Sequence, residues 1–327
     1  MDNFIFSARN IVDDSFGNDA DARVHYLVVP DEADTIQPLH EVEQGVWINK
    51  MVSSPESQQD ILIFVHGYNV SENDLFKSHK ILKQGLSDAG YTGQLVSFDW
   101  PCGQNVAAYL EDRYKAAQTA WLLVKGGISI LAARQNMSMP GQTAKCKVNT
   151  HILAHSTGAF VVREAFENAD NANNLHTTSW MVSQVVFISG DISSKSMILH
   201  SKCDALYDHS TRLTNFQNPY DQVLALSNVK RIGFENRVGR IGLPDKAPDS
   251  CVNVNSGDYF QVIKNNCSDP GDPIVAIPYS HSWYFDPQSN SEFIKDLYYT
   301  LQGDIDRNVI PTREIINGEL RLKINNI

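Results

Sequence analysis

The stretch His151-Ile-Leu-Ala-His-Ser-Thr-Gly158 places Ser156 between small residues, at a point where a strand gives way to a helix. A turn this tight strains the backbone of its central serine, and the flanking residues must be small because strand and helix nearly touch there. Ala154 stands where this pattern usually has glycine, and Gly158 keeps the second small position. The stretch therefore predicts a nucleophile elbow whose serine hydroxyl projects into a cleft.

The chain around this elbow alternates short apolar runs with helical patterns. That alternation favours βαβ units and an α/β fold, with a largely parallel sheet covered by helices on both faces. The clearest buried strand, Ile61–Val65, is apolar without alternation and ends at His66-Gly67. The expected strands are 23–30, 45–52, 61–65, 94–100, 148–155, 184–189, 213–218 and 228–234. The expected helices are 72–89, 105–134, 158–169, 222–227 and 291–302.

Length and composition favour a single domain over residues 1–327. Residues 1–60 are expected to supply opening edge strands. Residues 235–280, which are rich in Gly, Pro, Asn and Asp, are expected to form an irregular segment. A short hairpin is expected there around 251–262, together with a late loop that carries a histidine.

Charge and cysteine content narrow the class of protein. The formal net charge is −11 and the pI is near 5.3, which disfavours binding to nucleic acid or to anionic membranes. No segment approaches the length of an apolar membrane span, and Met1–Asn10 does not resemble a signal peptide, so a cytoplasmic location is expected. The five cysteines have irregular spacing and form no zinc motif, and pairing of Cys251 with Cys267 stays open. No metal or organic cofactor is expected.

Hydrolysis by a serine requires a base, an acid that orients the base, and donors for the oxyanion. The backbone amide of Tyr68 is one candidate donor, because His66-Gly-Tyr-Asn69 directly follows a buried strand. The amide of Thr157 is the second, because it starts the helix after the elbow and the helix dipole favours negative charge.

The acid and the base are sought at the ends of later strands. Asp221 lies in the turn after strand 213–218 and is the preferred acid, and Asp191 is the alternative because it also follows a strand. His281, in Tyr279-Ser-His-Ser-Trp283, is the preferred base because it gives the order Ser, Asp, His. We interpret His66 and His155 as orienting the oxyanion loop and the elbow.

The chain resembles the α/β-hydrolase superfamily from about residue 61 to residue 302. Phe98-Asp-Trp-Pro101, Ala154-His-Ser-Thr-Gly158 and Pro219-Tyr-Asp-Gln-Val-Leu-Ala-Leu-Ser227 are similar to an uncharacterised, mostly bacterial branch of esterase- and lipase-like serine hydrolases. The resemblance implies an eight-stranded, mostly parallel sheet and a catalytic triad carried by Ser156, Asp221 and His281.

The expected function is hydrolysis of a small-molecule carboxylic ester through an acyl-enzyme on Ser156. A thioesterase or an acyltransferase with the same triad is an alternative, because these activities differ only in the group that accepts the acyl chain. A binding protein that keeps the fold without turnover is a second alternative, since fold does not dictate function.

Overall fold

The computed structural model describes residues 2–52, 60–102, 109–128, 149–171, 180–229, 235–266 and 278–324. The chain divides into two units, which are described separately. Unit 1 comprises Met1–His79, Thr92–Leu153 and Phe160–Ser183, and unit 2 comprises Lys80–Tyr91, Ala154–Ala159 and Gln184–Ile327. Because both units combine separate stretches of the sequence, the single domain expected over 1–327 stays a prediction.

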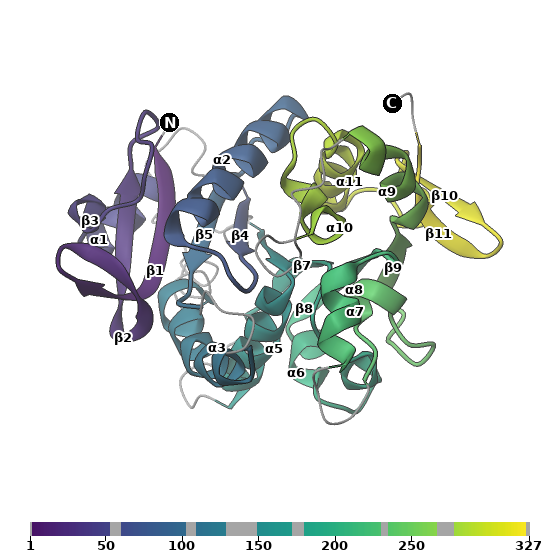
Figure 1. Cartoon of the computed structure of the whole chain (residues 1–327), viewed down its shortest axis with the longest axis horizontal. Helices are drawn as coiled ribbons and strands as arrows, with labels where there is room; N and C mark the ends of the chain where they lie inside the picture. The colour runs from purple at the N-terminus through teal and green to yellow at the C-terminus, as the bar shows by residue number, and fades with distance from the viewer. Residues whose placement is uncertain are drawn as a thin grey trace, which may run out of the picture. The chain divides into compact units, whose positions relative to one another are not determined.

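The described residues form eleven strands, three more than the eight expected (Figure 1). They are β1 (Asn3–Val12), β2 (Ser15–Val29), β3 (Glu41–Val42), β4 (Ile61–Val65), β5 (Gln94–Asp99), β6 (Thr150–His155), β7 (Val182–Ile188), β8 (Ser210–Gln217), β9 (Cys251–Asn255), β10 (Arg313–Ile316) and β11 (Glu319–Leu322). The strand order is β6-β4-β5-β1-β2-β3 in unit 1 and β10-β11-β9-β8-β7 in unit 2.

The relative direction of paired strands in the described chain agrees with the mostly parallel sheet that the sequence predicts. The pairs β1·β5, β4·β5, β8·β9 and β9·β11 are parallel. The antiparallel pairs are β1·β2 and β2·β3 near the N-terminus and β10·β11 near the C-terminus. The extra strands therefore belong mainly to hairpins at the two ends of the chain.

The longer helices of the described chain are α1 (Gln44–Val52), α2 (Glu72–Asp88), α3 (Tyr109–Leu123), α5 (Thr157–Asp170) and α11 (Ser291–Gln302). The shorter ones are α6 (Asp204–Asp208), α7 (Gln222–Val229), α8 (Val238–Ile241), α9 (Gly257–Ile263) and α10 (Tyr279–Ser282).

Helix α2 shows how local sequence sets the first and last residues of a helix. The Ser71 hydroxyl accepts a hydrogen bond from the amide of Asp74, and Gly90 turns the chain with a φ of 97°.

Helices cover both faces of the sheet in each unit. In unit 1, α1 packs on the face that carries Phe6, whereas His79 of α2 bonds Ser97 on the opposite face at 2.7 Å. In unit 2, the side-chain amide of Asn215 donates to the Val238 carbonyl of α8. The next residue, Phe216, meets Phe293 of α11 with ring centroids 5.4 Å apart. Neighbouring strand residues point to opposite faces, so this arrangement confirms the expected α/β class.

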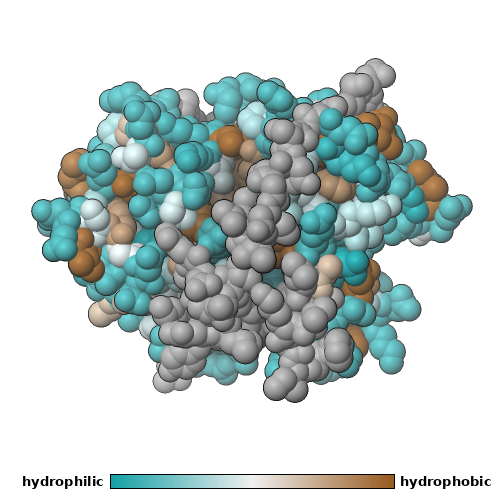
Figure 2. Space-filling model, viewed as in Figure 1, coloured by the Kyte–Doolittle hydropathy of each residue, from teal (hydrophilic) through white to brown (hydrophobic). Residues whose placement is uncertain are grey.

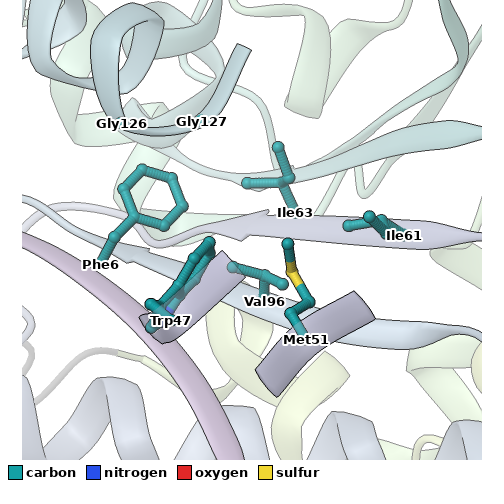
Figure 3. Close-up of a pocket in the computed structure, with 8 residues that line it drawn as sticks. All are labelled: Phe6, Trp47, Met51, Ile61, Ile63, Val96, Gly126 and Gly127. Carbon is teal, nitrogen blue, oxygen red and sulfur yellow. The ribbon is translucent and has the colours of Figure 1, made fainter. Parts of the chain in front are cut away.

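A small apolar cavity lies under α1 in unit 1 (Figure 3). Its volume of about 10 Å³ is at the lower limit for a single water molecule. Six side chains line it in Figure 3, those of Phe6, Trp47, Met51, Ile61, Ile63 and Val96, and the backbone of Gly126 and Gly127 completes the lining. It is a packing defect of the core and is too small for a substrate.

The strand expected over 45–52 is wrong, because these residues form helix α1. Trp47 and Met51 are four residues apart and are both buried, which is the spacing of one helical face. The Trp47 ring packs edge-on against Phe4 at 5.9 Å, and its indole N–H donates to the Leu27 carbonyl. Tertiary packing of this tryptophan therefore overrides the β propensity of the segment.

The irregular segment 235–280 also differs from expectation. Instead of a hairpin at 251–262, strand β9 pairs in parallel with β8 and is followed by helix α9. The strand expected over 228–234 falls partly in α7, and its residues 230–234 lie outside the described chain. Cys251 forms no disulfide within the described residues, and Cys267 lies outside them.

A buried ion pair joins β1 to β5 in unit 1. Arg9 Nε lies 2.7 Å from Asp99 Oδ1, and neither side chain is exposed to solvent. Ser7 donates a second hydrogen bond to Asp99 Oδ2, and Arg9 Nη2 donates to the Val70 carbonyl. Although burial alone raises the pKa of the Asp99 carboxyl, the Arg9 guanidinium lowers that pKa well below its usual value. The Asp99 carboxyl is therefore charged, and the charged form is stabilised by Arg9.

The displayed surface is mostly hydrophilic (Figure 2). Hydrophobic residues are scattered over the coloured atoms as small separate spots. None of the helices in the described residues is long and apolar enough to cross a membrane.

The substitution Arg9→Met tests the buried pair, because it leaves Asp99 buried without its cationic partner. We expect a loss of about 3–5 kcal/mol in the free energy of unfolding, measured by urea denaturation. Arg23→Met is the matched control, because the Arg23 side chain is 60% exposed where it pairs with Glu41. An exposed pair contributes about 1 kcal/mol or less. Equal losses in the two variants would contradict the prediction.

Candidate active site

The turn between β6 and α5 has the strained geometry that the sequence predicts. Ser156 adopts a φ of 54°, a left-handed conformation that residues other than glycine rarely take. Its amide donates to the Ile188 carbonyl at 3.1 Å, and its carbonyl accepts from the Asp191 amide at 2.9 Å. The end of β7 thus holds the serine backbone on both sides.

Thr157 begins helix α5 directly after this serine. The first amides of a helix have no intrahelical acceptor, and the helix dipole places partial positive charge there. Thr157 is buried, and its hydroxyl has no hydrogen-bond partner within the described residues. A first-turn amide beside Ser156 is suited to stabilise negative charge.

Asp221 is fully buried, and each of its carboxylate oxygens has a specific partner. Oδ2 accepts a hydrogen bond from His281 Nδ1 at 2.7 Å. Oδ1 accepts one from the amide of Leu224 at 3.0 Å, so the same side chain caps the N-terminus of α7. Helix capping therefore fixes the rotamer of the carboxylate that faces the histidine.

His281 lies in the short helix α10 and is 2% exposed. Because the Asp221 carboxylate only accepts hydrogen bonds, the proton of the neutral ring is assigned to Nδ1. The lone pair is then on Nε2, which is the nitrogen that can accept a proton. The pair Asp221 and His281 thus presents a base of defined tautomer.

Two polar contacts brace the segments that carry this pair. The side-chain amide of Asn218 donates to the Ser280 carbonyl at 2.7 Å. The Ser280 hydroxyl accepts from the amide of Gln222 at 3.2 Å. These contacts tie the residues on either side of Asp221 to the residue before His281.

His155 connects the elbow to the base. Its Nε2 lies 2.9 Å from the His281 carbonyl, and the two rings have centroids 4.7 Å apart. This contact joins the segment of the candidate base to the residue directly before Ser156. Within the described residues, the hydrogen bond of the His281 ring is the one from Nδ1 to Asp221.

The alternative acid, Asp191, faces a different partner. Its Oδ1 lies 3.1 Å from Arg237 Nε, and both side chains are buried. Asp191 contacts the elbow through its backbone amide, as described above. The structure therefore brings Asp221, and not Asp191, into hydrogen-bond contact with His281.

Tyr68 belongs to unit 1, where it lies half-buried in the loop after β4. In this loop, His66 Nδ1 donates to the Gly67 carbonyl, and His66 Nε2 accepts from the amide of Trp100. Asn69 turns the chain with a φ of 58°. Tyr68 and Thr157 lie in different units, so a joint oxyanion hole stays a prediction.

Several residues at this site were missed by reasoning from sequence, namely Asn218, Ser280, Tyr284 and Arg237. Tyr284 is fully buried near Asp221, with its hydroxyl 3.5 Å from the Ser256 hydroxyl, and burial raises the pKa of Tyr284 above its usual value. The only available signal was the position of Asn218, a polar residue that ends a strand just before the acid. The described residues contain no cluster of three or more side chains suited to hold a metal ion.

A comparison with protein families matches residues 40–257 to a family described as "Alpha/beta hydrolase of unknown function (DUF900)". The matched range includes Ser156 and Asp221 and ends before His281. No curated protein matches the chain.

Solved structures give low similarity. Aspergillus fumigatus lipase B has 11% identity and a TM-score of 0.38, with 78% of this chain and 57% of the lipase covered. The phospholipase PlaB of Legionella pneumophila, in complex with thio-NAD, has 15% identity and a TM-score of 0.34, with 81% and 67% covered. A Trichoderma reesei cutinase has 13% identity and a TM-score of 0.29, with 73% and 76% covered. The chain thus spans little more than half of lipase B.

The bond between Asp221 and His281 predicts the tautomer of the histidine. Asp221→Asn keeps an oxygen that can cap α7 and turns an amide donor toward His281 Nδ1. We expect the ring proton to move to Nε2 in this variant, which ¹⁵N NMR of labelled histidine detects. Asp191→Asn is the matched control and should leave the His281 signals unchanged. Unchanged tautomers in both variants would contradict the assignment.

Proposed function

Because the chain belongs to the alpha/beta hydrolase family DUF900, we propose that it is a serine hydrolase that cleaves carboxylic esters through an acyl-enzyme on Ser156. This membership confirms the superfamily resemblance and the α/β-hydrolase fold expected from the sequence. The observation that carries the proposal is the 2.7 Å hydrogen bond between His281 and Asp221. The His281 ring also packs against the ring of His155, the residue directly before Ser156.

In the proposed reaction, His281 Nε2 takes the proton of the Ser156 hydroxyl as the oxygen attacks the ester carbonyl. The resulting tetrahedral intermediate collapses when His281 returns that proton to the leaving alcohol. Water then attacks the acyl-enzyme with His281 again as the base, which releases the acid and restores Ser156.

Asp221 acts in this mechanism through the histidine. Its charge favours the Nδ1–H tautomer and stabilises the imidazolium that forms when the serine proton is transferred. Burial of Asp221 strengthens this effect, since charges interact more strongly where water is excluded. The cap on Leu224 keeps the carboxylate in place while the ring changes charge.

The negative charge on the substrate oxygen requires preorganised donors. Thr157 is proposed as one, because its amide starts α5 directly after the nucleophile. Tyr68 is proposed as the other, through its backbone amide in the loop after β4. Each donor of this kind contributes roughly 3 kcal/mol to lowering the barrier.

Loss of the nucleophile gives the first test. Ser156→Ala should lower kcat for p-nitrophenyl ester hydrolysis by about 10⁴-fold or more, because the acyl-enzyme no longer forms. Ser210→Ala is the matched control, since it removes another buried serine hydroxyl of unit 2, which bonds the Leu206 carbonyl. A Ser156→Ala variant with full activity would refute the proposal.

The same preparations separate catalysis from binding without turnover. A fluorophosphonate probe should label the wild type at Ser156, as located by mass spectrometry, and should not label Ser156→Ala. An unlabelled wild type would instead favour a binding protein that keeps the fold.

The two candidate acids are distinguished by kinetics. Asp221→Asn should lower kcat by about 10⁴-fold, because the histidine then holds the wrong tautomer. Asp191→Asn should retain activity of the same order as the wild type, since Asp191 pairs with Arg237. The melting temperature of each variant shows whether it is folded. A larger kinetic loss in Asp191→Asn would reverse the assignment.

The acyl group and its acceptor are best read from a substrate panel. Esters and thioesters of increasing acyl length, assayed with and without an added alcohol, report the acyl preference and the ratio of hydrolysis to transfer. We propose small to medium acyl esters, because the excursion after β7 holds only the short elements η4 (Ser194–Met197) and α6.

A further inference from the structure

We propose that His155 is a positioning residue, whose Nε2–H holds the backbone carbonyl of His281 and so sets the place of the base relative to Ser156. This inference rests on the proposed function, because it assigns His281 the role of base. It gives the elbow histidine a specific task beyond packing.

The backbone of His155 lies between strand β6 and the hydrogen-bonded turn at Ser156. His155 is the last residue of β6 and is 4% exposed, and the strained residue after it is held by the end of β7. The His155 side chain can therefore position a contacting segment relative to the elbow.

The His155 ring contacts the segment 281–285, which carries the proposed base His281. Its Nε2 lies 2.9 Å from the His281 carbonyl, and a carbonyl oxygen only accepts, so the ring proton is on Nε2. The ring also lies 4.7 Å from the His281 ring and meets Phe285 edge-on at 5.1 Å. Two residues of the base segment, four positions apart, thus pack against one histidine.

This contact complements that of Asp221. Asp221 orients the ring of His281 through Nδ1 but is attached to the end of β8. His155 holds the main chain of the same residue and is attached to the end of β6. With both bonds in place, the ring has a fixed orientation and a fixed distance from the elbow, which proton transfer requires.

Proton transfer is sensitive to such placement, since a displacement of about 1 Å can cost roughly 100-fold in rate. His155→Leu removes the donor and keeps an apolar side chain of similar bulk. His155→Gln removes the ring and keeps an N–H that can reach a carbonyl. Both variants lose the contact with Phe285, so the pair separates hydrogen bonding from ring packing.

The test measures ester hydrolysis and the rate of fluorophosphonate labelling in wild type, His155→Leu and His155→Gln. We expect His155→Leu to lower kcat and the labelling rate by about 10- to 100-fold, with KM within about twofold. His155→Gln should recover most of this loss. Thermal melting and titration of active sites correct for any fraction that fails to fold.

Each other result overturns the inference. Wild-type rates in His155→Leu would show that the bond does not position the base. Equal losses in both variants would show that ring packing alone matters. An unlabelled wild type would overturn the proposed function and this inference together, whereas labelling of the wild type with either of the first two results overturns the inference alone.

Discussion

The strained conformation of Ser156 is the constraint on which the site depends. A left-handed φ in a residue with a Cβ costs on the order of 1–3 kcal/mol, so neighbouring structure must hold it. The end of β7 does so by bonding both the amide and the carbonyl of this residue. That end is itself strained, because Ser189 has a φ of 46°. The strained turn at Ser156 is thus held by a second turn, at Ser189, whose backbone is also strained.

The turn after β7 is in turn held by the segment around α8. The Gly239 amide donates to the Gly190 carbonyl, and a Cβ on Gly239 would lie 2.2 Å from the Gly190 amide nitrogen. The Gly239 carbonyl accepts from the amide of Asn218, which precedes the acid by three residues. Close approach of a glycine backbone therefore links the turn that holds the nucleophile to the turn that carries Asp221.

Local patterns indicate the candidate site residues through their order along the chain. The elbow follows β6 and Asp221 follows β8, and parallel strands bring their ends to one edge of a sheet. His281 instead follows helix α9 and the short helix η5 (Lys264–Asn266) among the described elements. The partner of Asp191 was not predictable, because Arg237 is distant in sequence and only the fold brings them together. Sequence therefore left two acids open where the structure shows different partners for each.

The errors in the predicted fold also have local causes. Asp13 and Asp14 both have positive φ and form a two-residue turn between β1 and β2, and Asn317-Gly318 does the same between β10 and β11. Asn-Gly is a strong hairpin signal, whereas Asp-Asp is a weak one. Helix α1 was mistaken for a strand because a short apolar segment fits both periods, and only the packing of Trp47 distinguishes them.

Strand β1 gives the N-terminal hairpin a contact with the loop after β4. Arg9 of β1 is the buried partner of Asp99, and its second amino group bonds the Val70 carbonyl at the end of the loop that contains Tyr68. The start of the same loop is held by Trp100, whose ring stacks on His66 with centroids 5.3 Å apart. A buried guanidinium is stable only while its carboxylate is present. The hairpin, through Arg9, therefore helps to hold the loop that contains Tyr68.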